Sequence, residues 1–339
     1  MPVTVAADGE VSVGPEPIGH LAGFEFRVDP TARLADKRML LAAAERRLGD
    51  ELDRRARTLI EADDDAFELA VEDGAIAVTW EGHVLARLAP GRSLLEPALR
   101  TTRSLDRLST ERRALLREQL EAWLDRAIDR HAGPLRALAK IAADPNATAG
   151  VRALAAMLVD AGGVIPRRAV AAQIAGLNKA DRHVLGRLKV RLGALDIHVP
   201  ALLKPTALHW RAALLAVRGG QDMPRLPPPG AAVVDGSADP RGAALAFRRL
   251  GATWLRIDLA ERLAAHAHQV RGLGGADPVD RALVTSLGLD EESVGRLMKE
   301  VGFEGRDGAW KWRGRRPQRP DRPGARKPNA FAALADLKK

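Results

Sequence analysis

The sequence predicts a mainly helical α+β protein, in which a helical body and winged-helix-like units carry small β-hairpins and a disordered basic tail follows. Aromatic residues make up only 4% of the chain and Tyr is absent, so its cores must be built from Ala, Leu and Val, which favours helices. Apolar residues recur at helical spacing over long stretches. Short alternating runs beside glycine interrupt these stretches, as in β-hairpins.

The chain is long enough for more than one domain, because 339 residues predict two or three. Changes in composition give these expected segments: a hairpin–helix–hairpin domain at 1–103, a helical domain with a terminal hairpin at 104–218, a Pro/Gly-rich linker at 219–242, a winged-helix-like domain at 243–314 and a basic tail at 315–339.

Cysteine is absent, which excludes disulfides and thiolate zinc sites. No apolar run approaches the length of a membrane span, and the N-terminus lacks the pattern of a signal peptide. We therefore expect a cytoplasmic protein with no membrane partner.

A weak repeat predicts two β-hairpins in the first domain. Residues 9–22 and 74–89 each alternate across a turn, and the turn of the second copy is two residues longer. Between them, residues 34–62 place apolar side chains on one side of a long helix. Asp63, Asp64 and Asp65 are expected to end this helix. They are not expected to bind a metal, because consecutive carboxylates in an exposed turn rarely converge on one ion.

Residues 109–188 are predicted to be almost wholly helical, with Ser109 as the first N-cap. Prolines, including Pro134 and Pro166, are expected to divide this segment into shorter helices. The first helix has an apolar stripe that consists of Leu115, Leu116, Leu120, Trp123, Leu124 and Ile128.

After these helices, the spacing of apolar residues changes from that of a helix to that of a strand. Residues 189–192 and 196–199 alternate about Gly193 and predict a hairpin, and a helix is expected at 206–217. A helix–helix–hairpin unit is therefore expected ahead of the C-terminal one.

The linker is defined by prolines and glycines that resist both helix and sheet, above all at 227–230. Beyond it, a short strand is predicted at 254–257 and a helix at 258–270. Two short helices joined near Gly288, followed by a strand at 310–313, have the outline of a winged helix.

The basic charge of the chain is concentrated at its end. Residues 311–339 hold 10 Lys or Arg against 2 Asp, whereas the whole chain has a net charge of +9. The first 310 residues are therefore almost neutral, and we expect a neutral body with a cationic tail. Such a tail beside tryptophans suits a polyanion, because each neutralised phosphate releases counterions.

The sequence offers no recognisable catalytic chemistry. It contains no Gly-Lys pair, so it has no standard P-loop. The acidic run at 290–292 is expected to open a helix and not to form a helicase box. His266 and His268 are two residues apart on a predicted helix and point to different sides, and His198 is expected to make a structural hydrogen bond with Asp196. No metal or cofactor is therefore expected.

Five stretches, in this order, resemble the C-terminal, post-motor region of alphaproteobacterial Suv3-like ATP-dependent RNA helicases: 18–26, 188–193, 199–205, 310–314 and 331–335. The resemblance covers nearly the whole chain. It implies a superfamily-2 RNA helicase context, in which a RecA-like motor precedes this region and the C-terminal part helps to guide RNA. The motor motifs are missing here, so ATP and Mg would belong to a motor outside this sequence.

Three functions remain open. The first is an RNA-binding accessory module without an ATPase, whose partners are RNA and a helicase motor or another RNA-processing protein. Trp310 and Trp312 would stack on bases or pin the wing to its helices. The expected contacts to phosphate come from Lys189, Arg191, Lys311, Arg313, Arg315, Arg316, Arg319, Arg322, Arg326 and Lys327.

The second is a DNA-binding winged-helix regulator that inserts helix 291–301 into a major groove. The sequence argues against it, because Glu291, Glu292 and Glu300 lie on that helix. The third is a protein-interaction scaffold that docks through Phe331, Leu334 and Leu337.

Overall fold

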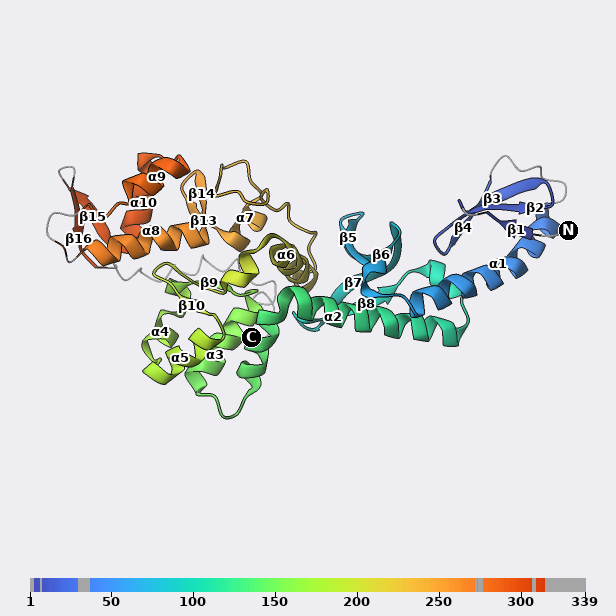
Figure 1. Cartoon of the computed structure of the whole chain (residues 1–339), viewed down its shortest axis with the longest axis horizontal. Coiled ribbons are helices and arrows are strands. Elements are labelled where there is room, and N and C mark those ends of the chain that lie inside the picture. Colours follow the sequence, from blue (N-terminus) through green and yellow to red (C-terminus); the bar gives the residue numbers. More distant parts are fainter. Residues whose placement is uncertain are drawn as a thin grey trace, which may run out of the picture.

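The computed structural model describes residues 3–6, 8–29, 37–271, 273, 277–306 and 309–314, and for 37–47 and 306 it describes the backbone alone. Over these residues the protein has ten α-helices and five small antiparallel sheets, so the predicted α+β fold is confirmed. Figure 1 shows the first four strands, β1 to β4 (within residues 3–28), at one end of the molecule. The last three helices, α8 to α10, lie at the other end with the strands β15 and β16 (all within residues 257–312), and the long helix α2 (Thr110–Ala143) lies between the two ends.

The repeat in the sequence corresponds to two four-stranded meanders, in which neighbouring strands follow one another along the chain. Both predicted hairpins are confirmed as the central pairs, β2–β3 and β6–β7. Each pair has a register shift that leaves one residue unpaired, Ile18 in the first and Leu85 in the second, and both are buried. The strands are β1 (Val3–Val5), β2 (Glu10–Val13), β3 (Glu16–Ala22), β4 (Glu25–Val28), β5 (Glu68–Glu72), β6 (Ala75–Trp80), β7 (His83–Ser93) and β8 (Glu96–Thr101).

Two long helices, α1 (Lys37–Ile60) and α2 (Thr110–Ala143), pack against each other beside these sheets. The predicted N-cap is confirmed, since Ser109 Oγ accepts a hydrogen bond from Arg112 N at 3.2 Å. The prediction that Pro134 divides this segment is confirmed, since α2 consists of two helical parts that meet at a kink. Ala132 has non-helical angles there (φ −123°, ψ 19°), because Pro134 lacks an N–H and would clash with the preceding turn of a straight helix.

For one member of the apolar stripe of α2, the prediction that it lies on the buried side is wrong. Leu115 is 38% exposed, whereas the other five members are at most 4% exposed. Successive helical residues are turned by about 100°, so Leu115 lies off the buried side that its neighbour Leu116 occupies.

The next segment forms a first winged-helix unit, residues 149–199. It consists of α3 (Ala149–Asp160), β9 (Val164–Pro166), α4 (Ala171–Ala175), α5 (Lys179–Arg187), β10 (Arg191–Leu192) and β11 (Asp196–His198). The hairpin about Gly193 is confirmed, and β11 pairs with both β10 and β9. The prediction that residues 109–188 are almost wholly helical did not include β9, because a strand of three residues is too short to show an alternating pattern.

The helix α6 (Pro205–Gly219) joins this unit to the body. Its Trp210 contacts Trp123 of α2 at a ring distance of 6.1 Å and stacks on His131 at 5.2 Å. After it, the expectation that residues 219–242 resist regular structure is partly wrong. Val233 and Val234 form β12 and pair with β14 (Thr253–Arg256), and α7 (Pro240–Ala246) begins within the predicted linker.

The second winged-helix unit, residues 247–314, begins with β13 (Phe247–Leu250) and β14 (Thr253–Arg256). The predicted strand and helix are confirmed as β14 and α8 (Ile257–Val270). The helix-turn-helix is confirmed as α9 (Arg281–Leu287) and α10 (Glu291–Val301), with Gly288 at φ 63° in the turn. The wing is a hairpin of β15 (Phe303–Arg306) and β16 (Ala309–Trp312), of which only β16 was expected.

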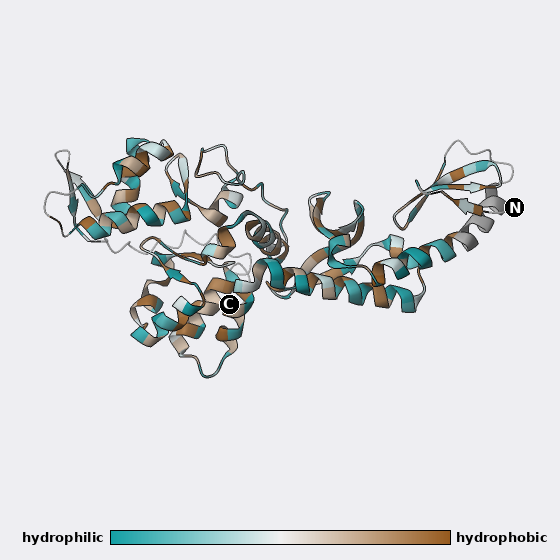
Figure 2. Ribbon diagram, viewed as in Figure 1, coloured by the Kyte–Doolittle hydropathy of each residue, from teal (hydrophilic) through white to brown (hydrophobic). Residues whose placement is uncertain are grey.

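In the part of the chain that the structure describes, most buried apolar side chains belong to three clusters. The largest runs from Val11 to Val217 and therefore continues across residues 103 and 104. A second lies within the second winged-helix unit and includes Leu195 of the first, and a small third cluster joins α6 to α7. Figure 2 shows the matching pattern of hydrophobic and hydrophilic residues along the helices. Among the described residues, no helix has the length and apolar character needed to cross a membrane.

Candidate nucleic-acid interface

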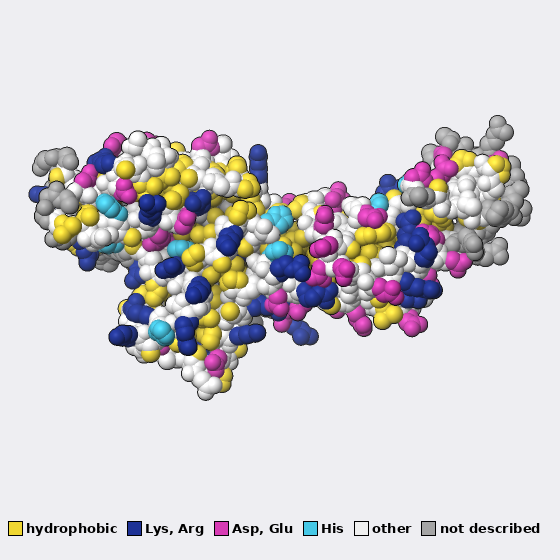
Figure 3. Space-filling model, in the orientation of Figure 1, with side chains coloured by type: hydrophobic (Ala, Val, Ile, Leu, Met, Phe, Trp, Pro, Cys, Tyr) yellow, Lys and Arg dark blue, Asp and Glu magenta, His cyan; other side chains and the backbone are white. Residues whose placement is uncertain are grey.

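The charge of the body is not evenly spread, although its total is close to zero. Residues 131–218 hold 13 Lys or Arg against 4 Asp or Glu, whereas residues 1–130 hold 19 against 25. In Figure 3, dark blue side chains gather over α3–α5 and β9–β10 with few acidic ones among them, while both colours mix along α1 and α2. The first winged-helix unit is therefore a basic surface next to an acidic half.

The basic surface centres on α5. One face of this helix consists of five exposed positions, at i, i+3, i+4, i+7 and i+8: Lys179, Arg182, His183, Gly186 and Arg187. Asp181 and Leu185 are buried on the opposite side. We call these five exposed positions the basic face of α5.

The basic face has few competing contacts. None of its cationic side chains forms an ion pair with a carboxylate of the described chain, although Arg182 Nη2 donates to Ile174 O at 3.0 Å. Nothing lies within 4 Å of a Cβ built on Gly186, so a ligand can approach the backbone there.

Capping interactions fix the position of α5. Asn178 Oδ1 accepts from Asp181 N at 2.9 Å, and Asp181 Oδ2 accepts from Asn178 N at 3.0 Å. The second oxygen of Asp181 accepts a 2.8 Å hydrogen bond from Thr148 Oγ1, and Thr148 is itself the N-cap of α3. A buried carboxylate thus ties α5 to α3 while the basic face stays exposed.

The structure brings two of the expected residues next to this face. Lys189 follows α5 with a left-handed backbone (φ 61°), Arg191 lies on β10, and both are exposed. The turn of this wing, in contrast, is covered by Glu261 of α8, whose carboxylate accepts hydrogen bonds from three main-chain N–H groups of the turn. The first wing therefore presents its strand, and not its tip, to a ligand.

The corresponding helix of the second unit is poorly suited to a polyanion. Exposed Glu292 pairs with Arg296 at 2.7 Å, and Glu291 pairs with Arg281 at 3.1 Å. Glu300 forms an ion pair with Arg248. The charges of α10 are therefore largely neutralised by one another and by their neighbours.

The tryptophans of the second wing lie against helices. Trp312 makes edge contacts with Phe303 and His268 at 5.1 Å each, and the Arg271 guanidinium lies 4.8 Å from its ring centre. Trp310 packs on the second buried cluster. The rings hold the wing on α8 and α10, which is the packing alternative raised by the sequence, although Trp312 is still 38% exposed.

The polar residues of this wing form a smaller basic group. Arg313 pairs with Glu304 at 3.3 Å, and Lys311 is exposed opposite Glu304 in the ladder. The other expected sites, namely Arg315, Arg316, Arg319, Arg322, Arg326, Lys327, Phe331, Leu334 and Leu337, lie outside the described residues.

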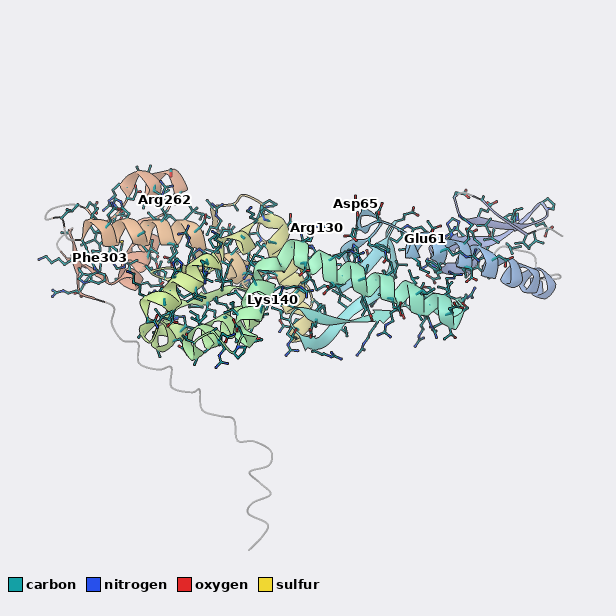
Figure 4. The ribbon with its side chains drawn as sticks, turned by 60° about the horizontal axis from the view of Figure 1, so that its bottom comes forward. Glu61, Asp65, Arg130, Lys140, Arg262 and Phe303 are labelled. Atoms are coloured by element: carbon teal, nitrogen blue, oxygen red, sulfur yellow. The ribbon has the colours of Figure 1, made fainter. Side chains whose placement is uncertain are left out.

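Further cations extend from α2 towards the first unit. Figure 4 labels Arg130 and Lys140 on this helix. Arg130 is used internally, because it pairs with Asp64 at 2.7 Å, whereas Lys140 is exposed and has no ion pair with a described carboxylate. Of the three adjacent aspartates, Asp64 therefore serves the packing of α2, through structural ion pairs with Arg126 and Arg130.

The sequence contains a signal for the basic face, which is not visible in the net charge of a long segment. A net charge summed over residues 1–310 cancels an acidic N-terminal part against a basic middle part. A shorter window, combined with the spacing of Lys179, Arg182 and Arg187 at i, i+3 and i+8, identifies α5. No cluster of three or more potential metal ligands exists among the described residues.

Comparisons with protein-family models, with curated proteins and with solved structures found no match for this chain.

Proposed function

We propose that this chain is a nucleic-acid-binding accessory module that holds a single RNA strand on the basic face of α5. The observation that carries the proposal is the set of four exposed cationic or imidazole side chains on one side of this helix, without carboxylate partners in the described chain. A row of cations at this spacing matches a phosphate backbone, and each contact releases counterions.

The position of α5 in the unit supports the same proposal. It follows α4 and precedes the hairpin, which is the place of the recognition helix in helix-turn-helix proteins. Lys189 and Arg191 extend the row along the chain, and Gly186 leaves room for close approach. The tail arginines would add further phosphate contacts.

RNA is preferred to DNA because of the resemblance to the post-motor region of Suv3-like RNA helicases. ATP hydrolysis would then belong to a motor outside this sequence, and the chain alone is expected to show no ATPase activity. An A-form duplex does not admit a helix into its deep groove, so RNA would bind as a single strand across the face of α5.

Duplex DNA is the second candidate, and the shape of α5 is the observation that favours it. A regular helix with an exposed basic face fits the major groove of B-form DNA. The helix concerned is α5, and not the mixed-charge helix 291–301 that the sequence first suggested.

The test measures fluorescence anisotropy of labelled single-stranded RNA, with unlabelled duplex DNA as competitor, across a series of salt concentrations. Replacing Lys179, Arg182 and Arg187 together with Ala should weaken RNA binding by about tenfold or more at 0.1 M salt. It should also reduce the slope of log K against log salt by about 2, since each lost single-strand contact contributes about 0.7.

The matched control replaces Arg92, Arg100 and Arg117, which are exposed on β7, β8 and α2, and so removes the same charge elsewhere. Equal losses in both triple variants would show that only the net charge matters, and the proposal would be wrong. Stronger competition by duplex DNA than by RNA would favour the second candidate. Truncation after Gly314 should weaken binding without abolishing it.

A further inference from the structure

The two winged-helix units meet where the wing turn of the first is bound by a carboxylate of the second. Three consecutive main-chain N–H groups, those of Ala194, Leu195 and Asp196, donate to the carboxylate of Glu261. The donor–acceptor distances are 2.6, 2.7 and 2.6 Å, which is short for N–H···O bonds and typical of bonds to a charged acceptor. Successive N–H groups that converge in this way form an anion-binding concavity.

The shape of this turn is set within its own unit. Gly193 N donates to Asp196 O at 3.1 Å, and Arg167 N donates to Leu195 O at 2.9 Å. The guanidinium of Arg167 also donates to Gly193 O at 2.8 Å. The N–H groups therefore do not depend on Glu261 for their direction, and a basic side chain stands beside them.

Gly193 makes the close approach of the carboxylate possible. A Cβ at this position would lie 2.4 Å from Cδ of Glu261, a distance that no real side chain tolerates. Any other residue would push the carboxylate out of the turn.

The contact between the two units is also stabilised on both sides of the Glu261 carboxylate. Leu195 is 3% exposed and belongs to the buried cluster of the second unit. Asp196 forms two hydrogen bonds of 2.8 Å with Arg248, which comes from β13 of the second unit. Removal of Glu261 alone would leave these contacts in place, so the turn should survive with three unpaired N–H groups.

We infer that the wing turn of residues 193–196 is an oxyanion-binding site, which Glu261 fills as an internal ligand and thereby latches the two units together. The ligand class is a phosphate or a carboxylate, because the site offers only main-chain donors and a neighbouring guanidinium. Arg191 lies on the strand that enters the turn, so an occupying phosphate would extend the basic face of α5. This last step rests on the proposed function, whereas the site itself does not.

The experiment titrates the full chain carrying Glu261→Ala with inorganic phosphate at constant ionic strength. Without phosphate, the variant should unfold about 5 °C or more below the wild type. Phosphate should raise its Tm in a saturable way and shift the amide NMR signals of residues 194–196. The wild type should show neither response, because its site is filled.

The matched control is Glu292→Ala, which removes an exposed carboxylate of the same unit that pairs with Arg296. It should lose little stability and should not respond to phosphate. The inference is overturned if Glu261→Ala is as stable as the wild type, or if phosphate affects both proteins equally and leaves the three amide signals unmoved.

A second variant keeps the test decisive if Glu261→Ala does not fold. Glu261→Gln keeps an oxygen acceptor but loses the charge, so the amides of residues 194–196 should exchange with solvent about tenfold faster than in the wild type. Unchanged exchange would refute the role of the anion.

An RNA-binding arm separates this inference from the proposed function. If the wild type binds no nucleic acid, the proposed function fails, while the phosphate titration of Glu261→Ala still decides the anion site. If the wild type binds RNA, phosphate should compete with RNA more strongly in Glu261→Ala.

Discussion

At the scale of single residues, Arg211 is the most unusual side chain of the described body. It is 1% exposed and has no carboxylate partner there. Its Nη1 donates to Leu245 O at 2.9 Å and to Leu202 O at 3.4 Å, which lie near the C-terminal ends of α7 and the 3₁₀ helix Pro200–Leu203. Helix C-termini carry partial negative charge, which offsets part of the cost of burying the guanidinium. Burial nevertheless lowers the pKa of Arg211 to about 10.

Replacing Arg211 with Ala should lower the free energy of unfolding by about 2–4 kcal/mol. The substitution leaves a cavity and deprives two carbonyls, those of Leu202 and Leu245, of their donor. Arg218→Ala is the control, since this exposed arginine of the same helix donates to one carbonyl, Gly91 O. It should cost less than about 1 kcal/mol in urea denaturation. Similar losses in the two variants would contradict the role assigned to Arg211.

At the scale of elements, α5 is a nine-residue helix that depends on its contacts for stability. Isolated helices of this length are marginal in water. The capping box of Asn178 and Asp181 satisfies its first N–H groups, and the bond from Thr148 to Asp181 couples it to the start of α3. One buried carboxylate therefore supports the N-termini of two helices, and the basic face inherits its position from this support.

Asp181→Ala should lower the free energy of unfolding by about 2 kcal/mol, because it removes both acceptor oxygens at once. Asp160→Ala provides the contrast, since Asp160 is exposed at the C-terminal end of α3. A carboxylate there opposes the helix dipole, so its removal should leave stability unchanged or raise it slightly. Chemical denaturation of both variants checks the difference, and equal effects would show that the capping contacts contribute nothing.

At the scale of the whole molecule, three histidines make stability depend on pH. Burial lowers the pKa of His131, His198 and His209 below the ordinary value of 6.5. Each of them therefore binds a proton more readily in the unfolded chain than in the folded one. Their contribution to stability is complete above pH 6.5 and is lost as the pH falls below it.

The free energy of unfolding should accordingly fall between pH 7.5 and pH 5.5, a range in which ordinary carboxylates stay ionised. Urea denaturation at several pH values measures this slope. His131→Phe keeps a ring on Trp210 and should reduce the slope. A wild-type stability that stays constant or increases towards pH 5.5 would refute the prediction.

The sequence predicts much of this architecture because the signals are local. Ser109, Gly288 and the alternation about Gly193 each specify a cap, a turn or a hairpin through contacts within a few residues. The errors occur where a neighbour in space decides. Val233 becomes a strand because β14, some twenty residues further along the chain, lies beside it.

The candidate site likewise has one part that the sequence predicts and another that depends on tertiary contacts. The spacing of cations on α5 is present in the sequence, but it emerges only when charge is read in a short window. The lack of acidic partners for them, and the opposite situation of Glu292 and Glu300 on α10, depend on which elements lie together. The tail residues named from the sequence stay a prediction.

By itself, the sequence determined the α+β class, the order of most elements, the repeat of two hairpins and the cations available to a ligand, because periodicity and turn chemistry act over short distances. Only the tertiary structure decided which cations remain unpaired and exposed. It also decided that Glu261, some 66 residues along the chain from Leu195, would occupy the wing turn. Such contacts depend on distance in space, on which local sequence patterns carry no information.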